Sequence, residues 1–257
     1  MRSKFKAKFG KPYLRSYKQS PYYKSAFYLK LYHILKKYKL KYDEKTNNII
    51  NLETMEPFFI FSFDESSQQF IANNVRVWSL IKPQMVKDTN KHKANVAGSY
   101  SLTTDGKDDL VFLENSKKET IVEVMKSLRK KNKKGIILLL IDNFPSHNAN
   151  LVKNCAKELN IELCYLPPYS PQLQPEEKIW HGIKRKLSEF KVDHLENFKN
   201  LKNKDLEKIL KEFTEKCFYE FVPSKNKWNK VHNNYIKPLI KLFNPKENSD
   251  WKVQKVY

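Results

Sequence analysis

The sequence predicts an α/β fold in which a mixed β-sheet carries helices on its faces. Several short extended segments come first, and helical and extended segments alternate after them, which is typical of such a sheet. The run Ile136–Ile141 is apolar without alternation, as expected for a strand covered on both faces. With 257 residues and 40% hydrophobic content, the chain can bury a substantial core.

The early extended segments contain aromatic and β-branched residues and end at turn signals. The first, Phe58–Phe63, is expected to end at Asp64. The other expected strands of this early group are Gln68–Ala72, Ala94–Leu102 and Leu110–Leu113. Asp105 and Gly106 mark a turn before Leu110–Leu113.

The second half of the chain alternates between helical and extended patterns. Lys118–Lys131 repeats apolar residues at helical spacing, and Ser146–Leu159 does the same after the strand Ile136–Ile141. Ile161–Leu166 follows as a short strand. Four prolines then exclude regular structure over Pro167–Pro175, and a helix is expected from Glu176 to about Phe190.

Charge divides the chain into three predicted regions. Residues 1–56 form a basic, tyrosine-rich arm with 14 Lys/Arg against 4 acids, and this arm includes a helix over Tyr22–Tyr38. Residues 57–190 form the central domain, with 20 basic residues against 15 acids. Residues 191–257 form a basic, mostly helical extension. The pattern favours a compact body with two basic flanks.

The net charge of +21 concerns partners rather than fold. Nucleic acid is the leading class of partner because its phosphates attract such a field. An anionic membrane surface and a general lysine bias are the alternatives. The three distant cysteines indicate reduced thiols, and the longest aliphatic run is too short to span a bilayer. We therefore expect a cytoplasmic, nucleoid-associated protein that does not insert into a membrane.

Three acids could converge at one edge of the sheet. Asp64 and Asp142 each follow a predicted strand, and Glu177 begins the helix after the proline-rich turn. If the two strands are parallel neighbours, the first two carboxylates lie at the same edge. Each pair at about 4 Å then repels by roughly 4 kcal/mol. Lysine partners, protonation, or a hard cation such as Mg²⁺ or Mn²⁺ could offset this repulsion.

The sequence around these acids resembles that of the IS630/Tc1-mariner group of DDE transposases. The matching blocks are FDESS, LIDNFPSH and LPPYSPQLQPEEKIW, and 34 residues separate Asp142 from Glu177. The resemblance covers about residues 57–190. It implies an RNase H-like fold, two Mg²⁺ ions with Mn²⁺ as a substitute, and DNA cleavage and strand transfer at element ends. It assigns catalysis and metal binding to Asp64, Asp142 and Glu177.

Other positions agree with that family's pattern or depart from it. Asn143 and His147 match positions commonly seen in the family, whereas Gln172 and Gln174 stand where the family usually has aspartate and asparagine. Glu65 should point away from Asp64 and form a structural salt bridge. Glu176 is expected to be a first-turn acid favoured by the helix dipole, and Trp180 to pack in or near the core.

DNA contacts are expected from residues near the acids and from the N-terminal helix. His147 could contact a phosphate, or it could make only local hydrogen bonds at a helix start. The remaining candidate DNA-binding residues are Lys184, Arg185, Lys186, Lys30, Lys36 and Lys37. A solvated basic face and, for the N-terminal helix, docking on the body are the alternatives.

The resemblance also sets expectations about partners. Double-stranded DNA, both element ends and target, is the substrate, and a homodimer would handle two ends together. We expect end recognition to reside in an upstream helix-turn-helix chain, with this chain as the second half of a split reading frame. The rival interpretations are a truncated, non-catalytic DNA-binding remnant and another RNase H-like nuclease.

Overall fold

The structure, a computed structural model, describes residues 21–43, 45–46, 48–70, 93–168, 170, 173–174, 176–194 and 202–221. The basic ends, with much of the predicted arm and extension, lie outside these residues, as does Gln172. The helices are α2 (Pro21–Lys37), α3 (Lys118–Lys131), α4 (Asn150–Glu158), α5 (Glu176–Asp193) and α7 (Asn203–Phe221). The strands are β1 (Leu40–Asp43), β2 (Asn48–Asn51), β3 (Phe58–Gln69), β4 (Lys93–Ser101), β5 (Asp109–Leu113), β6 (Ile136–Ile141) and β7 (Ile161–Tyr165).

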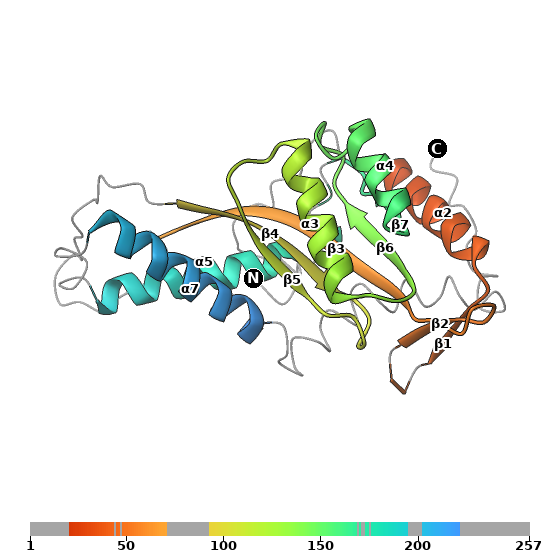
Figure 1. Cartoon of the computed structure of the whole chain (residues 1–257), viewed down its shortest axis with the longest axis horizontal. Helices are drawn as coiled ribbons and strands as arrows, with labels where there is room; N and C mark the ends of the chain where they lie inside the picture. Colours follow the sequence, from red (N-terminus) through yellow and green to blue (C-terminus); the bar gives the residue numbers. More distant parts are fainter. Residues whose placement is uncertain are drawn as a thin grey trace, which may run out of the picture.

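A five-stranded mixed sheet with the order β5-β4-β3-β6-β7 forms the centre of the molecule (Figure 1). β4 runs antiparallel to both of its neighbours, β3 and β5, whereas β6 runs parallel to both β3 and β7. This is the predicted mixed α/β architecture, and it has the RNase H-like arrangement. A separate two-stranded hairpin, β1–β2, was not predicted.

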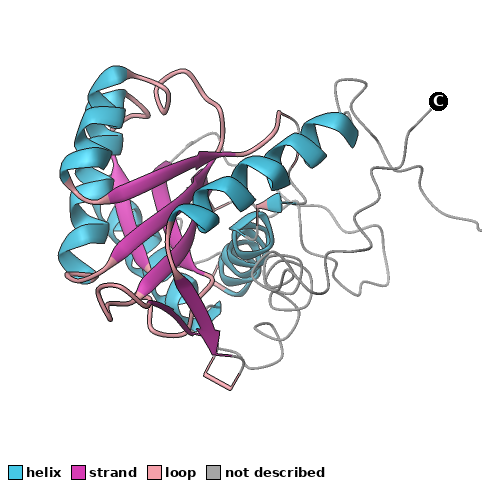
Figure 2. Ribbon diagram, turned by 90° about the vertical axis from the view of Figure 1, so that its right-hand side faces the viewer, coloured by secondary structure: helices cyan, strands magenta, loops and turns pink. Residues whose placement is uncertain are grey.

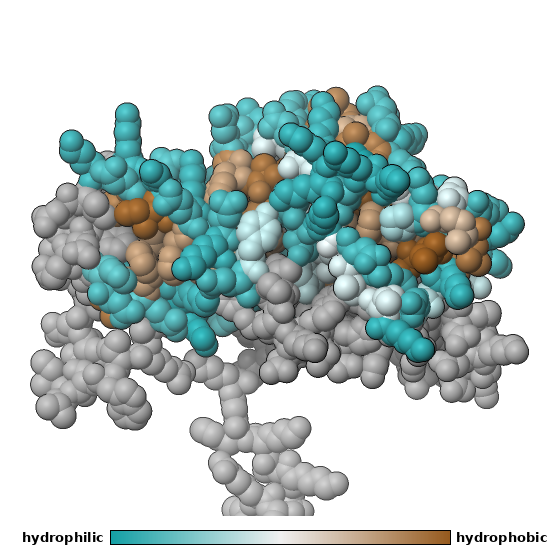
Figure 3. Space-filling view, turned by 60° about the horizontal axis from the view of Figure 1, so that its bottom comes forward, coloured by the Kyte–Doolittle hydropathy of each residue, from teal (hydrophilic) through white to brown (hydrophobic). Residues whose placement is uncertain are grey.

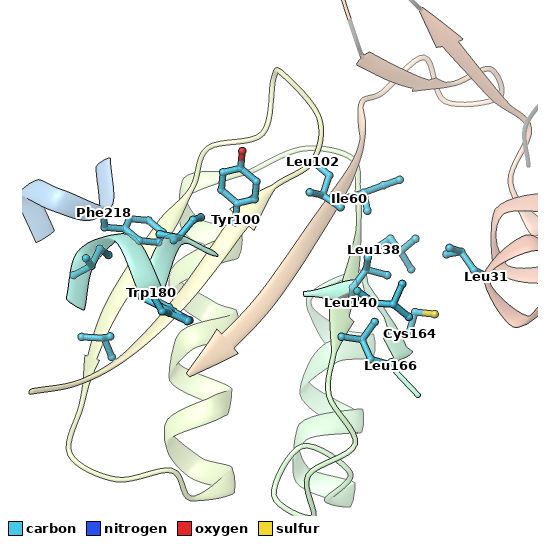
Figure 4. Packing of buried hydrophobic residues seen from close by; sticks show 14 of the residues in the cluster. Leu31, Ile60, Tyr100, Leu102, Leu138, Leu140, Cys164, Leu166, Trp180 and Phe218 are labelled. Atoms are coloured by element: carbon cyan, nitrogen blue, oxygen red, sulfur yellow. The ribbon is translucent and has the colours of Figure 1, made fainter. Parts of the chain in front are cut away.

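Helices cover both faces of the sheet (Figure 2). Buried residues of α3 and α4 pack on one face, where they join Phe59, Phe61 and Phe63 of β3. Buried residues of α2, α5 and α7 pack on the other face, where they join Phe58 and Ile60. Successive side chains of a strand point to opposite faces, so β3 contributes to both cores alternately. Figure 4 shows part of the second core, from α2 to α7.

β6 and α3 have the predicted bounds, whereas β3 does not end at Asp64. It continues to Gln69 because β4 pairs with it along this whole stretch. The prediction of a separate strand over Gln68–Ala72 is therefore wrong at its start, because Gln68 and Gln69 belong to β3. The end of that predicted strand, at Ala72, lies outside the described residues. α4 begins at Asn150 because a turn occupies residues 145–148.

Gly135 sets the start of the parallel pairing between β3 and β6. Its φ of +74° is a conformation that favours glycine, and an added Cβ would lie 1.8 Å from the carbonyl oxygen of Pro57. The next residue, Ile136, donates its backbone N–H to that same oxygen at 3.2 Å. This close approach fixes the register that brings Ser62 level with Leu140 further along.

The predicted N-terminal helix forms as α2 and packs against the sheet. Phe27, Leu31 and Leu35 are buried in the same core as β7. At the end of the helix, Lys37 Nζ and the Tyr38 hydroxyl both donate to Glu162 on β7, at 2.9 and 2.8 Å. Of the two alternatives for the N-terminal helix, docking on the body therefore holds for its described residues.

The surface in view is mostly hydrophilic, with smaller hydrophobic areas between (Figure 3). Exposed large hydrophobic side chains include Leu29, Met55 and Phe144. Among the described helices, none combines the length and apolar character that crossing a bilayer requires. The three cysteines are buried and free, as expected.

Candidate active site

Strand register brings the first two predicted acids to the same level. The last parallel pair of β3 and β6 is Ser62 with Leu140. Asp64 lies two residues after Ser62 within β3, on the same face as Ser62 by strand alternation, and Asp142 lies two residues after Leu140, just past the end of β6. The parallel register, rather than a strand end at Asp64, therefore makes the two acids neighbours.

Asp64 lies in a largely buried environment with two other acids nearby. Burial is the main cause that raises its pKa, to about 7, and the negative charges of Glu177 and Asp142 raise it further. The indole Nε1–H of Trp180 donates to Asp64 Oδ2 at 3.0 Å and acts in the opposite direction. The charges of both other predicted acids thus reach Asp64 at this edge of the sheet.

Asp142 is held by a loop and by a buried histidine. Its Oδ1 accepts the backbone N–H of Phe144 at 3.1 Å and lies 2.5 Å from Nδ1 of His147. Burial would raise the pKa of Asp142, but its hydrogen bond with His147 and the charge of that ring keep the pKa below its usual value. Asp142 is therefore ionised at neutral pH.

His147 lies between two carboxylates. Its Nε2 is 3.1 Å from Glu65 Oε2, which is the structural salt bridge expected for Glu65. Burial alone would lower the pKa of His147, but the hydrogen bonds and charges of Asp142 and Glu65 raise it to about 9. Both ring nitrogens donate in this imidazolium form. Because only 2% of His147 is exposed, its position suits holding Asp142 rather than open contact with DNA.

The two glutamates that begin α5 have opposite environments. Glu176 is fully buried and accepts the Ser62 hydroxyl at 2.5 Å. Burial raises its pKa well above the usual value, so the side chain is neutral. Glu177 is exposed. Glu176 is in the first turn of α5 as predicted, but burial, rather than the helix dipole, governs its protonation state.

Glycine and tryptophan complete the surroundings of Asp64. Gly98 on β4 is the register partner of Asp64. Trp180 is buried, as predicted, and its indole lies against Gly98, where a Cβ would come within 2.8 Å of the ring. The hydrogen bond from Trp180 to Asp64 was not predicted. The sequence does indicate that Trp180 lies close to the acids, because it is four residues after Glu176 and three after Glu177, and residues at these spacings share a helix face.

The donor chemistry of Asp64, Asp142 and Glu177 fits a hard divalent cation. All three offer carboxylate oxygens, and their mutual repulsion contributes to the raised pKa of Asp64. Within the described ranges, however, no three His, Cys, Asp or Glu side chains are already arranged to hold a metal ion. One oxygen of Asp64 is directed to Trp180 and one of Asp142 to His147.

The predicted DNA-binding residues of α5 differ in their surroundings. Arg185 pairs with Glu189 at 3.3 Å, and Lys186 pairs with Glu220 of α7 at 2.7 Å. Lys184 is partly exposed and lies seven residues after Glu177, two turns along the same helix face. DNA binding by all three residues stays a prediction.

The lysines of α2 lie at the β7 edge of the sheet. Lys37 is paired with Glu162, and Lys30 Nζ lies 5.3 Å from the ring centre of Tyr165. Lys36 Nζ lies 5.9 Å from the ring of Tyr32 on its own helix. These contacts indicate that Lys37 and Lys30 help to dock α2, whereas DNA binding by the three stays a prediction.

The mixed sheet thus carries Asp64 and Asp142 at one edge, and α5 begins with Glu176 and Glu177. The family model of the DDE superfamily endonucleases matches residues 60–202, more than half of the chain. The chain therefore belongs to the DDE superfamily endonucleases. A comparison with curated proteins found no match.

Several solved structures share the arrangement. The Mos1 transposase paired-end complex with left transposon end has 18% identity and a TM-score of 0.48, over 84% of this chain and 67% of that chain. The catalytic domain of Mos1 mariner transposase has 16% identity and a TM-score of 0.43, over 82% of this chain and 97% of that chain. A simian T-cell lymphotropic virus intasome in complex with the PP2A regulatory subunit B56 gamma has 12% identity and a TM-score of 0.43, over 63% of this chain and 47% of that chain. The family assignment rests on the family model.

Proposed function

We propose that this chain is the catalytic part of an IS630/Tc1-mariner-type transposase that cleaves DNA at element ends and joins the freed ends to target DNA. The observation that supports the proposal most is the parallel register of β3 and β6, which brings Asp64 and Asp142 to one edge of the sheet in a chain that belongs to the DDE superfamily endonucleases. The charges of Glu177 and Asp142 also act on Asp64, in the direction that raises its pKa.

In the proposed reaction, water attacks a backbone phosphorus at the element end, and the bond from phosphorus to the 3′ oxygen breaks. The 3′-hydroxyl that this releases then attacks a phosphorus of target DNA, and the bond from that phosphorus to the 3′ oxygen of the target strand breaks. Asp64, Asp142 and Glu177 would hold two Mg²⁺ ions, or Mn²⁺ in their place. Such ions lower the pKa of a bound water or hydroxyl and stabilise the leaving oxygen.

The chain's own residues would prepare these ligands. Trp180 orients Asp64 through its indole N–H. His147, itself held by Glu65, orients Asp142 and favours its ionised form. Lys184 and the basic flanks would bind phosphates without reading the base sequence. A homodimer and a helix-turn-helix partner chain would bring two ends together and recognise them.

A nicking assay on supercoiled plasmid tests this proposal. We expect the purified chain to nick DNA with Mg²⁺ or Mn²⁺ and to lose activity with a chelator. Metal ions supply several kcal/mol to such reactions, and about 1.4 kcal/mol corresponds to a tenfold change in rate. Asp142→Asn should therefore lower nicking by at least about a hundredfold while DNA binding persists.

Asp193→Asn is the matched control, because Asp193 is an exposed acid at the end of α5. It should leave nicking unchanged. Binding without nicking by both the unmodified chain and Asp142→Asn would favour the non-catalytic remnant. Nicking without any joined product on DNA with matched element ends would favour another RNase H-like nuclease.

A further inference from the structure

We propose that Trp180 is a positioning residue for Asp64, and that the C-terminal helix α7 holds Trp180 in place through Phe218. Helix α7 thereby becomes part of the active site. This inference rests on the proposed function, because it takes Asp64 to be a metal ligand. The family model ends at residue 202 and α7 begins at Asn203, so the match to the family does not cover this role.

The hydrogen bond between Trp180 and Asp64 fixes one carboxylate oxygen. The indole nitrogen can only donate, and it lies 3.0 Å from Asp64 Oδ2. Trp180 is only 2% exposed, so water does not readily replace this donor. With Oδ2 engaged, the carboxylate has a preferred rotation. Outer partners of this kind orient the ligands of metal sites.

Gly98 provides the space that the indole needs. It stands opposite Asp64 in the β3–β4 ladder, and any Cβ there would lie 2.8 Å from both Cη2 and Cζ2 of Trp180. The six-membered part of the indole therefore lies directly against the strand backbone. Such a close approach allows the N–H to reach across to Asp64, and glycine is the residue that permits it.

Phe218 of α7 packs against the indole. The two rings are stacked, with centres 5.8 Å apart and planes inclined by 28°. Phe218 is fully buried, and a Cβ on Gly98 would also come within 3.0 Å of its ring. Figure 4 shows Trp180 and Phe218 together beside Tyr100. The indole is thus enclosed between β4 and α7, which leaves it little freedom to turn away from Asp64.

The substitution Trp180→Phe removes the N–H and keeps an aromatic ring. Loss of an outer partner weakens metal binding or activity by about 10–100-fold. We expect the Mn²⁺ dissociation constant of the full chain without DNA to rise by about tenfold, as measured by the electron paramagnetic resonance signal of free Mn²⁺. Raised metal concentration should restore most of the nicking rate, which would not happen if the fold were simply damaged.

Two variants in α7 separate its role from general stability. Phe218→Leu loosens the support of the indole and should weaken Mn²⁺ binding in the same direction. Tyr219→Phe is the matched control, because it removes the hydroxyl that contacts Lys131 and leaves the stacked pair untouched. It should bind Mn²⁺ as the unmodified chain does.

The outcomes distinguish this inference from the proposed function. If the unmodified chain binds Mn²⁺ and loses that binding with Asp142→Asn, the metal site stands. Equal Mn²⁺ affinity in Trp180→Phe and Phe218→Leu would then overturn the positioning role alone. If the unmodified chain neither binds Mn²⁺ nor nicks DNA, the proposed function itself fails. If Trp180→Phe does not fold, Phe218→Leu decides the matter.

Discussion

Asp108 and Asp109 stand side by side where the chain enters β5, but their surroundings differ. Asp109 forms a salt bridge with Lys131 at 2.6 Å. Asp108 accepts the backbone N–H of Ser101 at 2.6 Å. Burial raises the pKa of Asp108 to about 7, although the Ser101 hydrogen bond and the charge of Lys131 act against this shift. Asp108 is therefore a source of pH-dependent stability outside the proposed metal ligands.

The substitution Asp108→Asn should reveal this dependence. Because the folded-state pKa is raised, the native chain binds more protons than the unfolded chain between about pH 4 and 7. Its stability therefore falls as the pH rises through that window. Asparagine keeps the acceptor and does not ionise, so the variant should be the more stable protein at pH 8, with the advantage fading towards pH 4. One pKa unit corresponds to about 1.4 kcal/mol, so the gain cannot exceed about 4 kcal/mol.

Denaturant unfolding at several pH values measures the effect. Asp105→Asn is the control, because Asp105 is exposed in the turn just before. Its stability relative to the unmodified chain should not change with pH. A pH-independent difference for Asp108→Asn would contradict the assigned protonation.

Glu176 shows what the sequence could and could not reveal about single side chains. Its burial was predictable, because Glu176, Trp180, Ile183 and Leu187 recur at helical spacing on the buried face of α5. Its Ser62 partner was not, because these two residues are 114 positions apart. The hydrogen bond from Trp180 to Asp64 likewise joins residues 116 positions apart: the helical spacing placed Trp180 near Glu177, but only tertiary packing brings it to Asp64.

Helix α2 illustrates how a basic segment can be part of the folded body. Leu31 is fully buried on α2, whereas Leu29, two residues earlier, is 58% exposed. Truncation of a buried leucine typically costs 2–5 kcal/mol. We therefore expect Leu31→Ala to lower the free energy of unfolding by about 2–5 kcal/mol, and Leu29→Ala by less than about 0.5 kcal/mol. Both are measured by urea denaturation of the full chain.

Equal, small losses for the two leucine variants would show that α2 does not pack on the sheet in solution. That result would restore the view of this segment as a separate DNA-binding arm. The contacts of Lys37 and Tyr38 with Glu162 favour docking instead.

Regular patterns explain which helices and strands were predictable. α3 and β6 have strong local signals, a helical apolar repeat and a buried aliphatic run, and both have the expected bounds. The extension of β3 beyond Asp64 depends on pairing with β4, which lies far along the chain. The strands of the hairpin β1–β2, LKYD and NIIN, have only four residues each, so they are too short for a periodic pattern to mark them.

For the molecule as a whole, the sequence predicted the class of fold and the three acids as candidates. Parallel pairing of β3 with β6 was an assumption from the order of elements, and the register confirms it. The network behind the acids was not predictable, because Trp180, Gly98 and Phe218 come from three elements that meet only in the folded chain. The family model supports the endonuclease assignment independently of this network.

Crystals of the chain soaked with Mn²⁺, measured for anomalous scattering, test the metal site most directly. We expect a peak about 2.1 Å from a carboxylate oxygen of both Asp64 and Asp142, with Glu177 bound to the same ion or to a second one. Full occupancy of other sites, with no peak in contact with Asp64 and Asp142, would contradict the proposed two-metal chemistry.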